Sequence, residues 1–133
     1  MTRSADHPNV LRQTLRHLQP GRAYSLRVIA ADPQYLDTRK EIALTARISD
    51  SAGEIAFEGN SFRSVFASNY AHTLGPYNRD HPAWFAYLRI IFRPRAETAE
   101  LALTDWADPH SPGGPAGGQT AVNFVQVQPY YEP

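Results

Sequence analysis

Hydrophobic and polar residues alternate with a period of two along most of the chain, which is the pattern of β-strands with one buried face. Residues 24–31 (YSLRVIAA) and 41–50 (EIALTARISD) show it clearly. A turn is predicted over residues 49–54, where Gly53 is free to adopt a positive φ. In order along the chain, strands are predicted over residues 24–31, 41–50, 54–59, 61–68, 83–94, 98–106 and 120–129. Short strands separated by Gly, Pro, Asn and Asp predict an all-β sandwich or barrel.

The segment 10–18 fits two structures. Leu11, Leu15 and Leu18 fall at helical spacing, whereas positions 11, 13, 15 and 17 fit one face of a strand. Periodicity alone leaves both open. Two long loops, 67–84 and 107–119, separate the later strands, and loops of this length inside a compact domain commonly carry function.

Composition narrows the class of protein. A chain of 133 residues fits a single domain, residues 1–133, with ordinary globular composition (42% hydrophobic, 20% charged). Thirteen basic and thirteen acidic residues balance, which argues against nucleic acid or an anionic membrane as partner. The absence of cysteine excludes disulfides, thiolate metal sites and cysteine nucleophiles. Neither a transmembrane run nor a signal-peptide core is visible, so we expect a cytoplasmic protein or a module of a longer secreted chain.

No catalytic signature stands out, and we assign no catalytic residues. The five histidines match no metal-ligand spacing. His72 and His81 share the loop 67–84 with Asp80, where a metal or acid–base site is conceivable. Surface loops often contain such residues without any catalytic role, so we rank an enzymatic function third among the functions considered.

Several stretches, in order along residues 10–128, resemble a known family. They are QTL followed by LQPGRAYSL (13–15 and 18–26), EIALTARISDSAGE (41–54), AWFAYLRIIFRPRAETAELALTDW (83–106) and NFVQVQP (123–129). Together they are similar to carbohydrate-binding modules attached to xylanases and cellulases.

The resemblance implies an antiparallel β-sandwich of the galactose-binding-like jelly-roll type, with residues 10–18 as a strand. It also implies a module of a larger extracellular or periplasmic protein, with neighbouring domains and a polysaccharide or oligosaccharide as partners. A structural calcium is common in the family. Here Asn123 and Phe124 stand where acidic residues are usual, which counts against that calcium, and we expect no other cofactor.

Candidate sugar-binding residues fall in two places, because pyranose rings stack on aromatic side chains and their hydroxyls need polar partners. In the strand predicted over residues 83–94, the alternate residues Phe85, Tyr87 and Arg89 share one face. A face that carries arginine should be solvated or only partly covered. Phe124, Gln126 and Gln128 share a parity on the last strand. The loop candidates are Asn69, Tyr70, His72, Tyr77 and Trp84. The alternative for Phe85 and Tyr87 is packing beneath the loop 67–84.

The sequence therefore predicts a non-catalytic carbohydrate-binding module, with the site either on a sheet face or in a loop at one edge. The main alternative is a structural or protein-interaction domain that accompanies a catalytic neighbour. An exposed aromatic patch is compatible with both.

Overall fold

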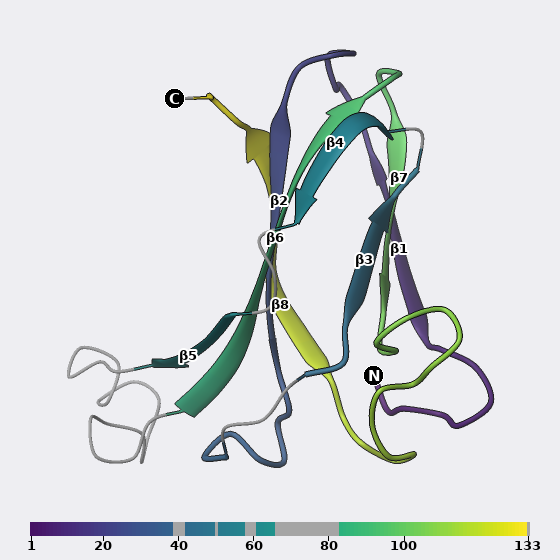
Figure 1. Cartoon of the computed structure of the whole chain (residues 1–133), viewed down its shortest axis with the longest axis vertical. Helices are drawn as coiled ribbons and strands as arrows, with labels where there is room; N and C mark the ends of the chain where they lie inside the picture. The colour runs from purple at the N-terminus through teal and green to yellow at the C-terminus, as the bar shows by residue number, and fades with distance from the viewer. Residues whose placement is uncertain (39–41, 50, 58–60, 66–82, 133) are drawn as a thin grey trace.

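The structure is a computed structural model that consists of strands and loops. The part of the chain that it describes is residues 1–38, 42–49, 51–57, 61–65 and 83–132, with 51–57 and 61–65 described by backbone alone. Two antiparallel sheets face each other, as Figure 1 shows. The prediction of an all-β sandwich is confirmed at this level. Within the described residues no helix is long and apolar enough to cross a membrane.

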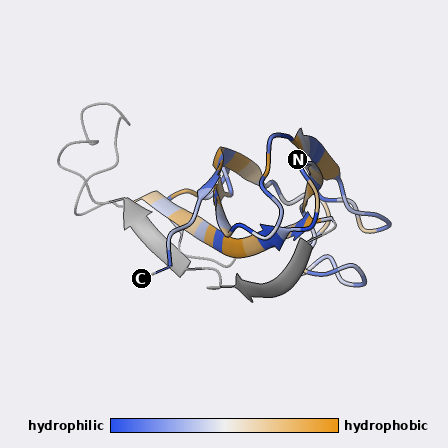
Figure 2. Ribbon diagram, turned by 90° about the horizontal axis from the view of Figure 1, so that it is seen from above, coloured by the Kyte–Doolittle hydropathy of each residue, from blue (hydrophilic) through white to orange (hydrophobic). Residues whose placement is uncertain are grey.

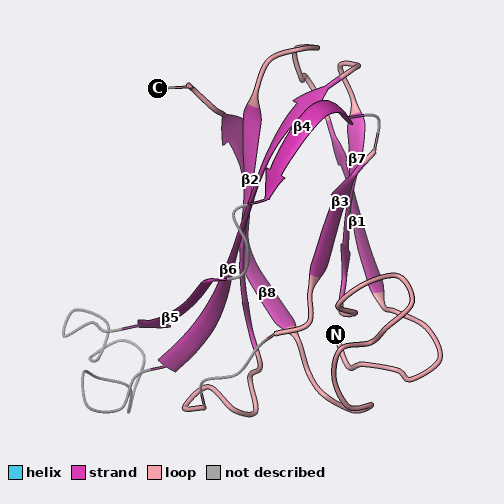
Figure 3. Ribbon diagram, in the orientation of Figure 1, coloured by secondary structure: helices cyan, strands magenta, loops and turns pink. Residues whose placement is uncertain are grey.

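In the described residues, eight strands form the two sheets, coloured magenta in Figure 3. The three-stranded sheet has the order β1-β7-β3, and the five-stranded sheet has the order β4-β6-β2-β8, with β5 also pairing with β6. β1 and β8 are therefore edge strands. The bounds are β1 Val10–Leu15, β2 Tyr24–Ala31, β3 Thr45–Ile48, β4 Ser51–Phe57, β5 Ser61–Val65, β6 Ala83–Pro94, β7 Ala99–Thr104 and β8 Ala121–Pro129.

The segment 10–18, ambiguous by periodicity, forms a strand over its first six residues, in β1. β1 pairs antiparallel with β7 from Val10↔Thr104 to Leu15↔Ala99. Leu18, the last residue of the helical stripe, is buried beyond the strand, and its N–H donates to the Glu97 carbonyl at 2.9 Å. Pairing with a strand far along the chain fixes this segment as β.

Two predictions in the next region are wrong in detail. Within residues 42–49, the described part of the predicted strand 41–50, the strand is Thr45–Ile48, although Ile42 and Leu44 are buried beside it. The predicted turn around Gly53 is instead part of β4. The pairing of β4 with β6 shifts register between Ala52 and Ala56, and a glycine inside a strand often marks such a bulge.

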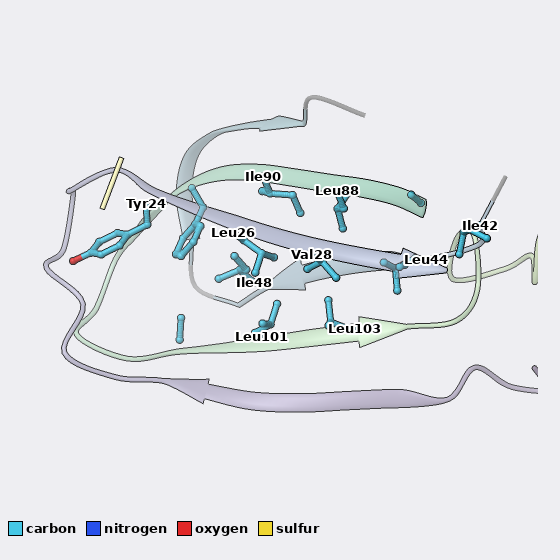
Figure 4. Packing of buried hydrophobic residues seen from close by; sticks show 14 of the residues in the cluster. Tyr24, Leu26, Val28, Ile42, Leu44, Ile48, Leu88, Ile90, Leu101 and Leu103 are labelled. Atoms are coloured by element: carbon cyan, nitrogen blue, oxygen red, sulfur yellow. The ribbon is translucent and has the colours of Figure 1, made fainter. Parts of the chain in front are cut away.

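The core lies between the two sheets and follows the period-two pattern. Leu26 and Val28 of β2 and Leu88 and Ile90 of β6 point inward from the five-stranded sheet, toward Leu101 of β7 (Figure 4). Hydrophobic and hydrophilic bands alternate along the ribbon in Figure 2. Burial of one parity in β2 and β6 leaves the other parity on the outer face of the sheet.

The Gly- and Pro-rich loop 107–119 wraps around the N-terminal segment. The Arg3 N–H donates to the Gly118 carbonyl, and the Gly117 N–H donates to the Arg3 carbonyl, both at 2.8 Å. The guanidinium is buried, and its Nε donates to the Asp105 carbonyl at 3.0 Å. A Cβ at Gly114 or Gly118 would lie 2.7 or 2.6 Å from Arg3 Nη1, so the loop approaches the arginine where glycine alone leaves room.

Candidate functional site

The outer face of β6 carries the candidate residues that sequence analysis placed on a sheet. Phe85, Tyr87 and Arg89 are all half-buried, as are Ile91 and Arg93 further along the same parity. The opposite parity is buried from Ala86 to Phe92. The prediction that the arginine-bearing parity is partly covered is therefore confirmed.

Neighbouring strands extend this outer face on the side of β2 and β8. Residues that are directly paired across antiparallel strands share a face. Arg27 of β2 pairs with Arg89 on one side and with Gln126 of β8 on the other. Ile29 pairs with Tyr87 and with Asn123 in the same way. The register thus brings aromatic, guanidinium and amide groups from three strands together.

We refer to Tyr87, Arg89, Arg27, Asn123 and Gln126 as the polar face. Both amide residues on it are exposed, whereas the two arginines and the tyrosine are half-buried. Sequence analysis missed Arg27 and Asn123. The alternation in residues 24–31 already placed Arg27 on the outward parity, but its neighbours depend on strand pairing, which the local pattern does not contain.

The segment that follows β8 covers one border of the polar face. Tyr130 lies beneath the Arg89 guanidinium, with Cζ 5.3 Å from the ring centroid, which is cation–π geometry. Its N–H donates to the Ala23 carbonyl at 2.9 Å. Further along, Arg93 forms an ion pair with Glu132 and donates to the Gly21 carbonyl at 3.1 Å. These contacts restrict the positions of two of the arginines on the outer face.

Of the candidate residues assigned to the loop, only Trp84 is among the described residues. Asn69, Tyr70, His72 and Tyr77 lie outside the described residues, as does the loop with His81 that was considered for catalysis. Trp84 was assigned to the loop but belongs to β6, where its backbone N–H donates to the Leu36 carbonyl at 2.7 Å. It is half-buried and has the opposite parity to Phe85 and Tyr87, so the structure does not place it on the polar face.

Phe124 also departs from the predicted parity. It was expected to share a face with Gln126 and Gln128, but the pairing of β2 with β8 shifts between Arg27 and Ile29. Asn123 pairs with Ile29 and Gln126 with Arg27, so two residues of β8 lie opposite Val28 alone. This β-bulge moves Phe124 out of the alternation.

A groove of about 460 Å³ lies over the other sheet, on the outer face of β1, β7 and β3. Ala102 and Thr104 of β7 contribute to its lining, together with the ion pair between Arg12 and Glu100 (2.5 Å). Its lining consists of Pro8, Val10, Arg12, Thr45, Arg47, Ile48, Ser49, Glu100, Ala102, Thr104, Asp108 and Pro109. No aromatic side chain is among them, so this groove offers a sugar polar contacts without a stacking surface.

Across the described part of the chain, no three His, Asp or Glu side chains gather in a way that could hold an ion. Asn123, which stands where the resembling family often has an acidic residue, accepts a hydrogen bond from the Phe124 N–H through Oδ1 at 2.8 Å. That amide thus supports the local backbone of β8.

Comparison with protein-family models, with curated proteins and with solved structures gave no match to this chain.

Proposed function

We propose that this domain is a non-catalytic carbohydrate-binding module whose ligand lies across the polar face of the five-stranded sheet. The observation that carries the proposal is the strand register, which places Tyr87 and Arg89 beside Arg27, Asn123 and Gln126. In the proposed complex an apolar C–H face of a pyranose ring packs on the tyrosine. The guanidinium and amide groups then hydrogen-bond the hydroxyls.

The dimensions of this face suit an extended oligosaccharide. Adjacent strands lie about 4.8 Å apart, so β6, β2 and β8 together span roughly 10 Å across the strands. Along β6, the five residues from Tyr87 to Ile91 cover about 13 Å. A surface of this size accommodates a short stretch of a polysaccharide and leaves both of its ends free to continue.

The charges on these strands favour a ligand rich in hydrogen-bond acceptors. The sequences of β2, β6 and β8 contain Arg27, Arg89 and Arg93 and no acidic residue. Guanidinium groups donate hydrogen bonds and accept none. In the proposed role, the domain keeps neighbouring domains of a larger extracellular or periplasmic protein close to a polysaccharide.

Tyr87→Ala tests the proposal. The variant should bind polysaccharide at least about tenfold more weakly, because truncation of an aromatic hot-spot residue costs about 2 kcal/mol or more and each 1.4 kcal/mol is about tenfold in affinity. Its melting temperature should fall by no more than about 4 °C, since Tyr87 lies on the outer parity of β6. Affinity electrophoresis through gels that contain xylan, mixed-linkage β-glucan, galactomannan, pectin or alginate measures the binding.

Thr104→Ala is the matched control, because Thr104 is half-buried on the outer face of the other sheet and lines the groove there. It should leave retardation unchanged. If Thr104→Ala weakens binding and Tyr87→Ala does not, the ligand occupies the groove and the polar face is the wrong surface.

One observation favours the alternative of a protein-interaction domain. β1 is an edge strand, and its residues Val10 to Thr14 are all exposed. Leu11 pairs with the buried Leu103, so its parity faces inward, yet 46% of its surface is accessible. An exposed apolar edge strand is a template for pairing with another chain. Absence of retardation by every polysaccharide tested would favour this role.

A further inference from the structure

Phe124 has two features that are unfavourable for the stability of the fold. Its φ is 50°, in the left-handed region that bulky residues rarely adopt because Cβ approaches the backbone too closely. The residue is 68% exposed, compared with 45% for the neighbouring Val125. Both strain and exposure of an aromatic ring to water are unfavourable, and strained residues cluster at functional sites.

The β-bulge explains how the ring is presented. Phe124 and Val125 together lie opposite Val28, whereas Val122 and Val127 on either side pack against the core. A bulge of this kind redirects side chains away from the regular alternation. Because Val122 and Val127 already supply the core contacts of β8, the ring of Phe124 is not needed there.

The backbone at the bulge is also supported. Asn123 Oδ1 accepts a hydrogen bond from the Phe124 N–H at 2.8 Å, so the disrupted ladder does not leave this donor unsatisfied. The side chain that stabilises the bulge thus comes from the polar face itself. Gln126, also on that face, lies two residues further along.

We propose that Phe124 is a second aromatic contact for the saccharide, at the edge of the five-stranded sheet where the polar face ends. This inference rests on the proposed function. A saccharide that crosses from Tyr87 over Arg27 reaches β8, where Asn123 and Gln126 flank the bulge. In the sequence of β8, Phe124 stands between Asn123 and Gln126, so one short stretch of this edge strand carries an exposed ring and two amides. A sugar unit requires both a stacking surface and hydrogen-bonding groups.

Phe124→Asn separates binding from folding. Asparagine tolerates left-handed φ better than phenylalanine does, so the melting temperature should stay unchanged or rise by a few degrees. Affinity for whichever of the polysaccharides xylan, mixed-linkage β-glucan, galactomannan, pectin or alginate retards the wild-type domain should fall about tenfold or more. Gain of stability together with loss of binding is a combination that a merely structural residue does not produce.

Two controls complete the experiment. Phe124→Trp should retain binding, because it keeps an aromatic surface at the same backbone position. Val125→Asn changes the other residue of the bulge, which is 45% exposed, and should leave affinity unchanged.

The outcomes distinguish this inference from the proposed function. If Tyr87→Ala weakens binding and Phe124→Asn does not, the role of Phe124 is wrong and the polar face stands as the site. A marked fall in melting temperature for Phe124→Asn would make the residue structural and would also overturn the inference. If no polysaccharide retards the wild-type domain, both proposals fail together.

Discussion

Phe92→Ala is expected to lower the free energy of unfolding by about 3–5 kcal/mol, the usual cost of removing a buried phenylalanine side chain. Phe92 is 0% exposed, and its ring stacks on Tyr24 with centroids 5.8 Å apart and an interplanar angle of 27°. The truncation would leave a cavity at the end of the core where β2 and β6 meet, because Tyr24 and Phe92 are directly paired. Urea denaturation followed by tryptophan fluorescence measures the change.

Phe124→Ala is the matched control because it makes the same chemical change at an exposed position. It should shift the free energy of unfolding by no more than about 0.5 kcal/mol, as is typical of surface substitutions, since alanine keeps the left-handed backbone without relieving it. Equal costs for the two variants would mean that the sheets do not pack through Phe92. The comparison removes the same side chain at a buried and at an exposed position.

The alternation of hydrophobic and polar residues predicted strands correctly where one face of the strand is exposed to solvent and the other is buried. β6 coincides with the predicted residues 83–94, and its buried and half-buried residues alternate along most of its length. β8 also coincides closely with its predicted range. In β6 the hydrophobic effect acts on alternate side chains, so the pattern that is visible in the sequence is the pattern of burial.

The pattern failed where both parities are buried. Ile42, Ala43 and Leu44 are all less than 9% exposed, although alternation assigned Ala43 to an outward face. A small apolar residue such as alanine does not indicate on which face of a strand it lies. The same limit applies to the turn predicted at Gly53, because glycine is as compatible with a β-bulge as with a turn.

The candidate site could be predicted only in part, because its assembly depends on pairing between distant strands. Parity alone identified the outward residues Tyr87 and Arg89 of β6. Nothing in the local pattern states that Arg27 pairs with Arg89, or that the amide of Gln126 lies beyond it. Nor does it reveal the extra residue in β8, which displaced Phe124 from the parity assigned to it.

Asp105→Ala is expected to destabilise the domain by about 2–4 kcal/mol, because buried hydrogen bonds to a charged group are strong and their loss leaves donors unsatisfied. Asp105 is 0% exposed and follows β7 directly. Its Oδ1 accepts a hydrogen bond from the Asn9 N–H at 2.8 Å, and its Oδ2 accepts one from Asn9 Nδ2 at 2.7 Å. The carboxylate thereby holds the residue that precedes β1 against the end of β7.

Asp108→Ala is the control for the loss of a carboxylate as such. Asp108 is exposed, and its Oδ1 accepts one hydrogen bond, from the His110 N–H at 2.7 Å. Its replacement should cost less than about 1 kcal/mol, because water replaces the lost acceptor. A double-mutant cycle between Asp105→Ala and Asn9→Ala should give a coupling energy above about 0.5 kcal/mol, as expected for residues in direct contact.

Asp105→Ala also tests whether the stability of the domain can be lowered without weakening the binding of polysaccharide. The pair of Asp105 and Asn9 links the end of β7 to the start of β1, in the three-stranded sheet, whereas the polar face belongs to β6, β2 and β8. Below its melting temperature, Asp105→Ala should therefore bind polysaccharide as the wild type does. A loss of affinity in the folded variant would connect the saccharide site to the end of the three-stranded sheet, and would count against a ligand confined to the polar face and its edge.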